Sequence, residues 1–481
     1  MVYCDHFVTT FYRDRVENSQ DTFTIKVYIV NIYLFFLITI FSLRISNMFY
    51  LKKGKKGYSF NSDIGLDCFC LGTLFLASAP FLSCFFFLYP LFKGILNNFH
   101  LLIKDRFNQL FILISSILII KSLFSSFFPS NQIESWDPIL NWAGIANWIP
   151  LFICFMGFNQ YLDKESKREQ IAKYFIIGTI PVLVSCIGQF WFKWYGPFET
   201  LNGLIIWFQR PLTSSNQNVT GLFSNPNYAG VWLTMMWPLS FALLVKKINI
   251  KEYFRSKIMA LIIIALTSSI LLTNSRNAWI GFLLSMPFLY GKKSLKWYIP
   301  CLAILISIIF LSFLPFVPIE IRNLAQMIVP DNVQTKISEI TLNLHTFPRL
   351  NIWSSAIGFI IQRPMFGWGA GAFPHLYRFK SGFWNDHTHN LFLELSVSYG
   401  LLISILIFIV LITILIKSFY TIFISHKESS IIDKGWWVAG FIFFFSHLND
   451  VLIYDIRINL ASWIFLIGLK NIFYINTNEL K

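Results

Sequence analysis

Runs of about 20 apolar residues recur along this chain, and clusters of lysine and arginine separate them. A hydrocarbon layer of about 30 Å requires roughly 20 residues of helix to cross it. Charged residues make up 13% of the chain, whereas soluble domains carry about 25%. These features exclude a soluble globular enzyme and a disordered chain, and they predict an all-α polytopic membrane protein.

The charge and the cysteines exclude further classes of protein. The net charge is +15, but the basic residues lie in short clusters between apolar runs, as in the loops of a membrane protein. This placement argues against a nucleic-acid binder. The seven cysteines form no CxxC pair and most lie within apolar runs, which argues against a disulfide framework or a zinc site.

The apolar runs predict about 12–13 transmembrane helices. Pro80 divides the long run 64–94, which we interpret as a tight hairpin of two helices. This count places every basic cluster on one side of the membrane, as the positive-inside rule requires, with the C-terminus inside. It also places the N-terminus outside, and peripheral docking of the first run is the alternative. The predicted spans are 27–46, 64–94, 107–128, 139–162, 172–194, 228–245, 258–273, 278–290, 297–316, 391–416, 436–454 and 458–473.

The spans and one long connection divide the chain into segments. Residues 317–390 are far longer than an ordinary connection and contain aromatics, a helical pattern and punctuating Gly and Pro, so we expect a large periplasmic loop subdomain. The other segments are an N-terminal segment at 1–63 with the possible extra span, transmembrane helices at 64–316 with an outward loop at 195–227, C-terminal transmembrane helices at 391–475, and a cytoplasmic tail at 476–481.

Three arginines are predicted on the outward side, where the positive-inside rule disfavours them. Arg210 precedes GLFSNPN, Arg276 lies in the turn TNSRNAWIG, and Arg349 begins an amphipathic helical pattern in PRLNIWSSA. A guanidinium stays charged and matches phosphate oxygens bidentately, so these side chains suit a diphosphate. The alternatives are interfacial anchoring of Arg210 and Arg276, and an ordinary turn at 225–227.

A second set of polar residues precedes the span that begins at Leu391. His387 and His389 lie just before this helix, and Asn390 and Glu394 are four residues apart on one helix face. Histidine is the natural general base near neutral pH. Two solvated loop histidines are the alternative.

A metal held by the two histidines is a further alternative, with Asp386 as the third ligand. We predict no metal, because no further ligand cluster is present in the sequence. The glycine run at 367–371 follows a predicted helix and not a strand, so we interpret it as a close-packed turn and not as a nucleotide site.

The sequence SHLNDVLIYDIR adds ionisable residues near the outer end of the last two spans. These are His447, Asp450, Asp455 and Arg457. Ionisable groups at membrane depth are costly, so they are functional candidates by default. An internal ion pair between Asp455 and Arg457 is the alternative.

Together these motifs resemble the O-antigen ligase and O-antigen polymerase superfamily of bacterial membrane glycosyltransferases. The resemblance extends from about Ile64 to Ile472 and is strongest over 210–402. It rests on the order of Arg before GLFSNPN, TNSRNAWIG, PRLNIWSSA with PMFGWGAGAF, and THN before ELSVSYGLL. SHLND resembles a late family motif more loosely, and the extra first span departs from the family's usual count.

The resemblance implies an enzyme of the bacterial inner membrane with its active face in the periplasm. Such enzymes transfer a glycan from undecaprenyl diphosphate to an acceptor sugar hydroxyl, generally without a metal, and we predict no cofactor. The acceptor is the lipid A core for a ligase and another lipid-linked glycan for a polymerase, and the sequence does not separate the two. Attack opposite the diphosphate would invert the anomeric configuration.

Site residues are carried over by motif. Arg210 and Arg276 would hold the diphosphate, and Arg349 would face the same cavity. His389 would act as base or position the acceptor, and both His389 and Arg276 count as catalytic candidates. The secondary candidates are His387, Asn390, Glu394, His447 and Asp450.

Two other functions remain as alternatives, a transporter of a solute such as inorganic carbon and a non-catalytic polysaccharide-assembly protein. A transporter typically carries charged or broken-helix sites near the bilayer midplane, often in repeated halves. Here the polar residues gather at the outer ends of the spans. This placement favours chemistry at a membrane face.

Overall fold

The computed structural model describes residues 63–127, 136–201, 203–213, 217–291, 294–312, 314, 317–329, 348–425 and 429–478. The described part is mostly helical, and its strands form one two-stranded antiparallel ribbon of β1 (Phe198–Thr200) and β2 (Ile205–Trp207). The N-terminal segment, with its predicted span at 27–46, lies outside the described residues.

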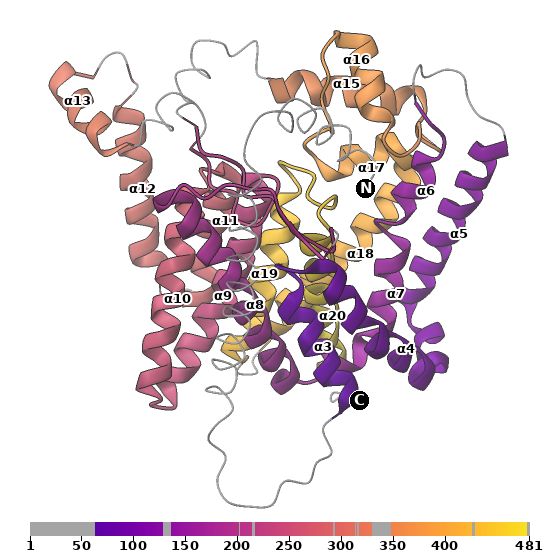
Figure 1. Cartoon of the computed structure of the whole chain (residues 1–481), viewed down its shortest axis with the longest axis horizontal. Helices are drawn as coiled ribbons and strands as arrows, with labels where there is room; N and C mark the ends of the chain where they lie inside the picture. Colours follow the sequence, from indigo (N-terminus) through magenta and orange to yellow (C-terminus); the bar gives the residue numbers. More distant parts are fainter. Residues whose placement is uncertain are drawn as a thin grey trace, which may run out of the picture.

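Most of the helices run roughly parallel to one axis and form a bundle, with shorter helices across one end (Figure 1). The helices are α3 (Ile64–Phe75), α4 (Pro80–Lys104), α5 (Arg106–Phe127), α6 (Leu140–Ile145), α7 (Ile149–Gly157), α8 (Glu165–Trp191), α9 (Pro226–Asn249), α10 (Tyr253–Leu272), α11 (Arg276–Tyr290), α12 (Leu295–Leu311), α13 (Ile319–Ile328), α15 (Pro348–Gln362), α16 (Ala372–Ser381), α17 (Leu391–Tyr399), α18 (Leu401–Phe419), α19 (Ile431–Ser446) and α20 (Ile456–Asn478).

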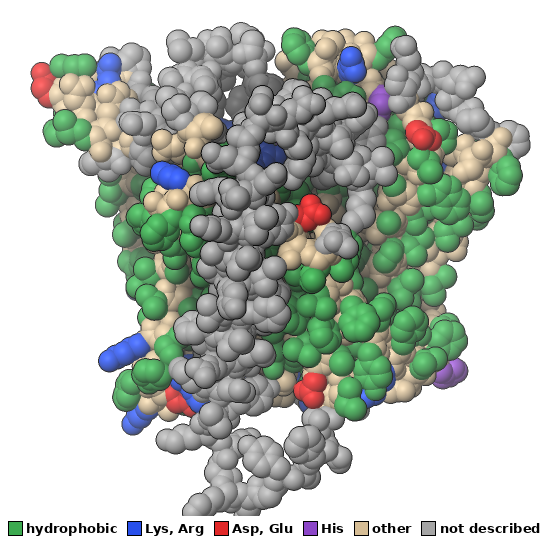
Figure 2. Space-filling model, viewed as in Figure 1, with side chains coloured by type: hydrophobic (Ala, Val, Ile, Leu, Met, Phe, Trp, Pro, Cys, Tyr) green, Lys and Arg blue, Asp and Glu red, His purple; other side chains and the backbone are tan. Residues whose placement is uncertain are grey.

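The burial of the helices fits a lipid environment. Among the described residues, 8 helical segments are long and apolar enough to cross a membrane, and α3 and α12 are shorter apolar helices. Most residues of α9 and α20 are buried, whereas few residues of α4, α5 and α10 are, and these three helices expose many large apolar side chains. Hydrophobic side chains cover much of the described flank (Figure 2). Such a surface is costly in water but not in lipid, so the prediction of an all-α polytopic membrane protein is confirmed.

The bounds of several spans differ from those predicted. Pro80 begins α4, and α3 packs against α4, which confirms the hairpin. The predicted span 139–162 breaks between α6 and α7, where Pro150 lies in the first turn of a new helix, and the span 391–416 breaks at Gly400. The span predicted at 436–454 is shorter, because α19 ends at Ser446 and the chain is non-helical up to Asp455.

The glycine-rich turn after α15 packs against the break between α17 and α18. Gly367 and Gly400 both have positive φ, +63° and +90°. A Cβ on Gly367 would lie 2.6 Å from the carbonyl oxygen of Val397, and one on Gly400 would overlap the carbonyl oxygen of Met365. The backbone N–H of Trp368 donates to the Val397 carbonyl at 2.7 Å. The close-packed turn is confirmed, and it fixes α15 and α16 onto α17.

Ion pairs join α8, α9 and α19 at one end of the bundle, which we call the basic end. Arg168 binds Asp433 through Nε at 2.8 Å and Nη2 at 3.1 Å, and its Nη1 donates to the carbonyl of Leu162. Lys246, in the last turn of α9, pairs with Glu169 at 2.8 Å. The opposite end, where α9 begins and α19 ends, is the histidine end described below.

Removing one partner of the Arg168–Asp433 pair is expected to destabilise the bundle. Arg168→Met leaves a largely buried carboxylate unpaired and should lower the free energy of unfolding by about 3–5 kcal/mol. Lys167→Met is the matched control, because its pair with Asp163 is more exposed and worth about 0–1 kcal/mol. Chemical unfolding of the detergent-solubilised protein measures both, and equal stabilities would contradict a role for the buried pair.

Candidate functional site

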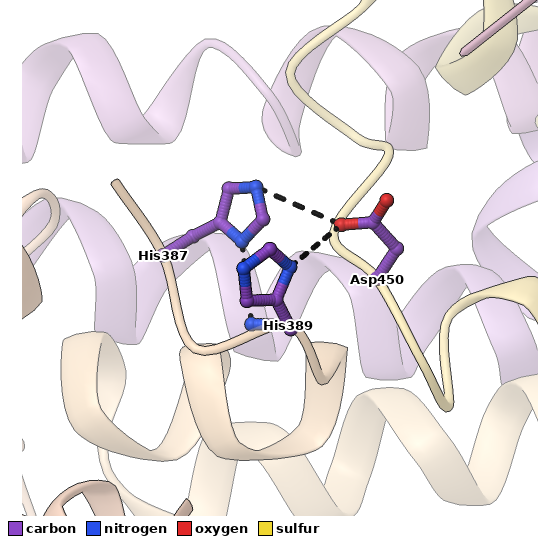
Figure 3. A group of neighbouring side chains, drawn as sticks. All are labelled: His387, His389 and Asp450. Atoms are coloured by element: carbon purple, nitrogen blue, oxygen red, sulfur yellow. Dashed lines mark hydrogen bonds and ion pairs between the residues drawn. The ribbon is translucent and has the colours of Figure 1, made fainter. Parts of the chain in front are cut away.

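His387, His389 and Asp450 meet at the histidine end. The loop before α17 brings the two histidines to the loop between α19 and α20, which carries Asp450 (Figure 3). The Nδ1 of His389 lies 3.2 Å from Oδ1 of Asp450, and the Nε2 of His387 lies 3.7 Å from the same oxygen. Asp450 is only 3% exposed. His389 and Asp450, which are 61 residues apart in the sequence, therefore meet at one buried carboxylate oxygen, and His387 faces the same oxygen.

Hydrogen bonds fix the roles of the ring nitrogens. The backbone N–H of His389 donates to Nδ1 of His387 at 3.2 Å, so the proton of the neutral His387 ring lies on Nε2. Burial lowers the pKa of His387 to about 4, although the charge of Asp450 acts in the opposite direction. In His389 the carboxylate accepts from Nδ1, which leaves Nε2 as the basic atom of the neutral ring. His389 therefore has the geometry of a general base supported by a carboxylate.

The backbone around His389 is held in an uncommon conformation. His389 has a φ of +52°, in the left-handed region that costs a non-glycine residue about 1–3 kcal/mol. The buried carboxylate of Glu394 accepts from the backbone N–H of Thr388 at 2.9 Å and from the hydroxyl of Tyr454 at 2.9 Å. Trp353 donates to the Thr388 carbonyl at 3.0 Å. These contacts hold the histidine loop against α15, α17 and the α19–α20 loop.

The second oxygen of Asp450 is also occupied. The Nδ2 of Asn227 donates to Oδ2 at 2.7 Å, and the backbone N–H of Val451 donates to Oδ1 at 3.0 Å. Burial raises the pKa of Asp450, but the hydrogen bond with His389 and the charges of both histidines outweigh it and lower this pKa to about 2. Asp450 is therefore ionised at any working pH.

Arg349 lies within electrostatic range of this cluster, and Arg276 lies within electrostatic range of Arg349. Burial lowers the pKa of Arg349, the charge of Asp450 raises it, and the charge of Arg276 lowers it further. Arg276 is the first residue of α11 and its side chain is exposed, while Ser275 caps the helix. A positively charged Arg349 thus faces the ionised carboxylate and His387, and Arg276 faces Arg349.

Arg210 is exposed, and no described contact joins its side chain to the histidine cluster. Its backbone is nevertheless fixed by Gln189, a fully buried residue of α8. The Nε2 of Gln189 donates to the Arg210 carbonyl at 2.6 Å and to Oγ1 of Thr220 at 3.2 Å. Its Oε1 accepts from the N–H groups of Thr220 and Gly221. Gln189 therefore anchors the loop that presents Arg210.

The remaining candidates have structural partners. Asn390 caps α17 and donates to the Leu448 carbonyl at 3.0 Å. His447 is buried, with Nδ1 2.8 Å from the Phe443 carbonyl and Nε2 accepting from the N–H of Leu452. Asp455 and Arg457 form the internal ion pair considered from the sequence, with Nε 2.9 Å from Oδ1.

The ligand atoms of His387, His389 and Asp450 all lie within 4.8 Å of one another, so this group has the spacing of a metal site. Its hydrogen bonds fit a cation poorly, because both histidine nitrogens that face Asp450 carry protons in the arrangement above. Nearby guanidinium groups oppose a cation further. Asp386, the third ligand in the alternative drawn from the sequence, instead accepts from Nε1 of Trp384 at 2.7 Å.

Sequence reasoning missed Asn227, Gln189 and Tyr454. Asn227 lies in the Asn225-Pro226-Asn227 turn, which predicts only the start of a helix, and Asn225 indeed caps α9. Gln189 and Tyr454 lie within predicted apolar spans. A polar side chain inside such a span is the one signal that marks these two residues for inspection.

The buried state of His387 predicts a dependence of stability on pH. A histidine with a lowered pKa binds fewer protons in the folded state, so its contribution is complete above about pH 6.5 and is lost as the pH falls towards about 4. The unfolding temperature of the wild type should fall more steeply across this window than that of His387→Gln. Parallel curves for the two proteins would contradict a buried neutral His387.

The comparisons with known proteins bear on this site. A family model described as O-antigen ligase matches residues 258–408, and no curated protein matches the chain. The matched region contains Arg276, Arg349, His387 and His389, whereas Arg210, Asn227 and Asp450 lie outside it. The matched domain supports the assignment of this multi-pass membrane protein to the O-antigen ligase and polymerase family.

Proposed function

We propose that this protein transfers a glycan from undecaprenyl diphosphate to an acceptor sugar hydroxyl at the histidine end of the bundle. The observation that carries the proposal is the hydrogen-bonded His389–Asp450 pair, with Arg349 in electrostatic range of Asp450 and Arg276 in range of Arg349. The His389–Asp450 pair can accept a proton, and the two arginines can bind an anion. The matched O-antigen ligase domain supplies the reaction class in which both are needed.

The chemistry requires a proton acceptor and charge neutralisation together. The Nε2 of His389 accepts the proton of the acceptor hydroxyl as its oxygen forms a bond with the anomeric carbon. The bond between that carbon and the diphosphate oxygen breaks, and the electron pair leaves with undecaprenyl diphosphate. Asp450 stabilises the imidazolium that results, and Arg276 and Arg349 stabilise the leaving diphosphate. Attack opposite the leaving group inverts the anomeric configuration.

We also propose that Arg210 takes part in diphosphate binding and that the transfer needs no metal. Arg210 binds the diphosphate from the loop that Gln189 anchors, so three arginines supply the positive charge that a divalent cation supplies in other phosphate sites. No protein residue need form a covalent intermediate.

The orientation in the membrane follows from the charges at the two ends. Cytoplasmic loops carry an excess of lysine and arginine, and the basic end carries the clusters around Arg168 and Lys246. We therefore place the basic end in the cytoplasm of a bacterial inner membrane and the histidine end in the periplasm. The acceptor is the lipid A core or a second lipid-linked glycan. Neither the family match nor the site geometry favours the transport alternative.

Transfer by the purified protein in lipid nanodiscs tests the proposal. The donor is an undecaprenyl diphosphate-linked glycan, the two acceptors are offered separately, and mass spectrometry follows the products. His389→Ala and Arg276→Ala should each lower the rate by about 10²–10⁴-fold, because each removes a group used in the transition state.

Arg106→Ala is the matched control for the loss of an arginine. Arg106 is exposed and begins α5 at the opposite end of the bundle, so its removal should leave the rate unchanged. Wild-type rates in both the His389→Ala and Arg276→Ala proteins would overturn the proposed site.

A further inference from the structure

We infer that Asn227 is a positioning residue that holds the Asp450 carboxylate in register with His389 and ties it to the helix that carries Arg276. This inference rests on the proposed function and extends it to a residue outside the matched domain. It is carried by a continuous line of side-chain hydrogen bonds through α9, α11 and the α19–α20 loop.

The backbone of Asn227 is fixed independently of its side chain. Asn227 is the second residue of α9, after Asn225 as cap and Pro226 as the first helical residue. The Asn225 side chain accepts from the backbone N–H of Asn227 at 2.8 Å. The helix cap therefore uses Asn225, and the amide of Asn227 remains for other contacts.

Both ends of the Asn227 amide are used, and their chemistry determines its orientation. Nδ2 donates to Oδ2 of Asp450 at 2.7 Å, and Oδ1 accepts from the hydroxyl of Ser275 at 2.8 Å. An ionised carboxylate only accepts hydrogen bonds, so a flipped amide would place two acceptors together. The Ser275 oxygen also accepts from the N–H of Ala278 at 3.4 Å, and its proton is thus directed to Asn227.

The line of contacts has a consequence for the proposed base. The hydrogen bond from Asn227 to Oδ2 fixes the rotation of the Asp450 carboxylate, so that Oδ1 faces Nδ1 of His389. Ser275 is the residue immediately before Arg276. Asn227 therefore fixes the proposed base and the start of the helix that carries the proposed diphosphate ligand relative to each other.

Asn227→Asp is the sharpest test, because it keeps the shape of the side chain and replaces the donor with an acceptor. The second carboxyl group repels the Asp450 carboxylate, and a proton on the adjacent imidazole of His389 relieves this repulsion, so the protonated, inactive form of His389 is favoured. We expect kcat to fall on the order of 10²-fold, as for a misplaced catalytic group, with a smaller change in KM for the lipid-linked donor. The acidic limb of the pH–rate profile should move to higher pH.

Asn225→Asp is the matched control. It adds the same charge two residues earlier, keeps a side chain that can cap α9, and has no described contact with Asp450. The pH profile of this variant should match that of the wild type. A purely structural role for Asn227 would lower the yield of folded protein and leave the acidic limb in place, which would overturn the inference.

A second measurement does not depend on glycosyl transfer. Diethyl pyrocarbonate modifies neutral imidazole, and mass spectrometry of the peptide containing His389 gives the midpoint of its reactivity against pH. The midpoint should rise in Asn227→Asp and stay in place in Asn225→Asp. An unchanged midpoint in both would overturn the positioning role, whereas a raised midpoint in a protein without transfer would overturn only the proposed function.

Discussion

The arrangement of the histidine end depends on one buried carboxylate. Asp450 is ionised and 3% exposed, and a charge in such a place is tolerated only where hydrogen bonds and opposite charges surround it. Its partners come from α9, from the loop before α17 and from its own loop. Satisfying this one group therefore brings together helix ends that are far apart in the sequence.

The rest of the fold supports this junction from both sides. The ion pairs of the basic end hold α8, α9 and α19 in register at their far ends. At the histidine end, the glycine-rich turn fixes α15 onto α17, so that Arg349 and His389 belong to one packed unit. α4, α5 and α10 contribute mainly exposed apolar surface to the described part of the chain.

Much of the fold follows from the sequence, because hydropathy and proline act locally. The apolar runs predict the helices, and Pro80 predicts the hairpin of α3 and α4. The break at Gly400 does not follow in this way, since it results from packing against Met365 in a distant turn. Because residues 391–416 form one apolar run, the sequence predicts a single helix there and gives no sign of the break at Gly400.

The candidate site follows from the sequence only in part. His387 and His389 are predictable from their place before a helix, and Asp450 from its cost at membrane depth. The contact between the histidines and Asp450 is not predictable, because no local sequence rule pairs the end of α19 with the start of α17. The contact between Asn227 and Asp450 cannot be predicted for a similar reason, since the turn that contains Asn227 already accounts for an asparagine at this position.

If glycan transfer takes place at the histidine end as proposed, cells that lack this protein no longer consume their lipid-linked glycan. The most direct measurement compares the pool of undecaprenyl-linked glycan and the surface lipopolysaccharide of a gene-deletion strain with those of the same strain carrying the wild-type or the Asp450→Asn gene. We expect lipid-linked glycan to accumulate in the deletion strain, with truncated surface glycan, and both to recover only with the wild-type gene. An unchanged pool and an unchanged surface profile in the deletion strain would contradict the proposed transfer.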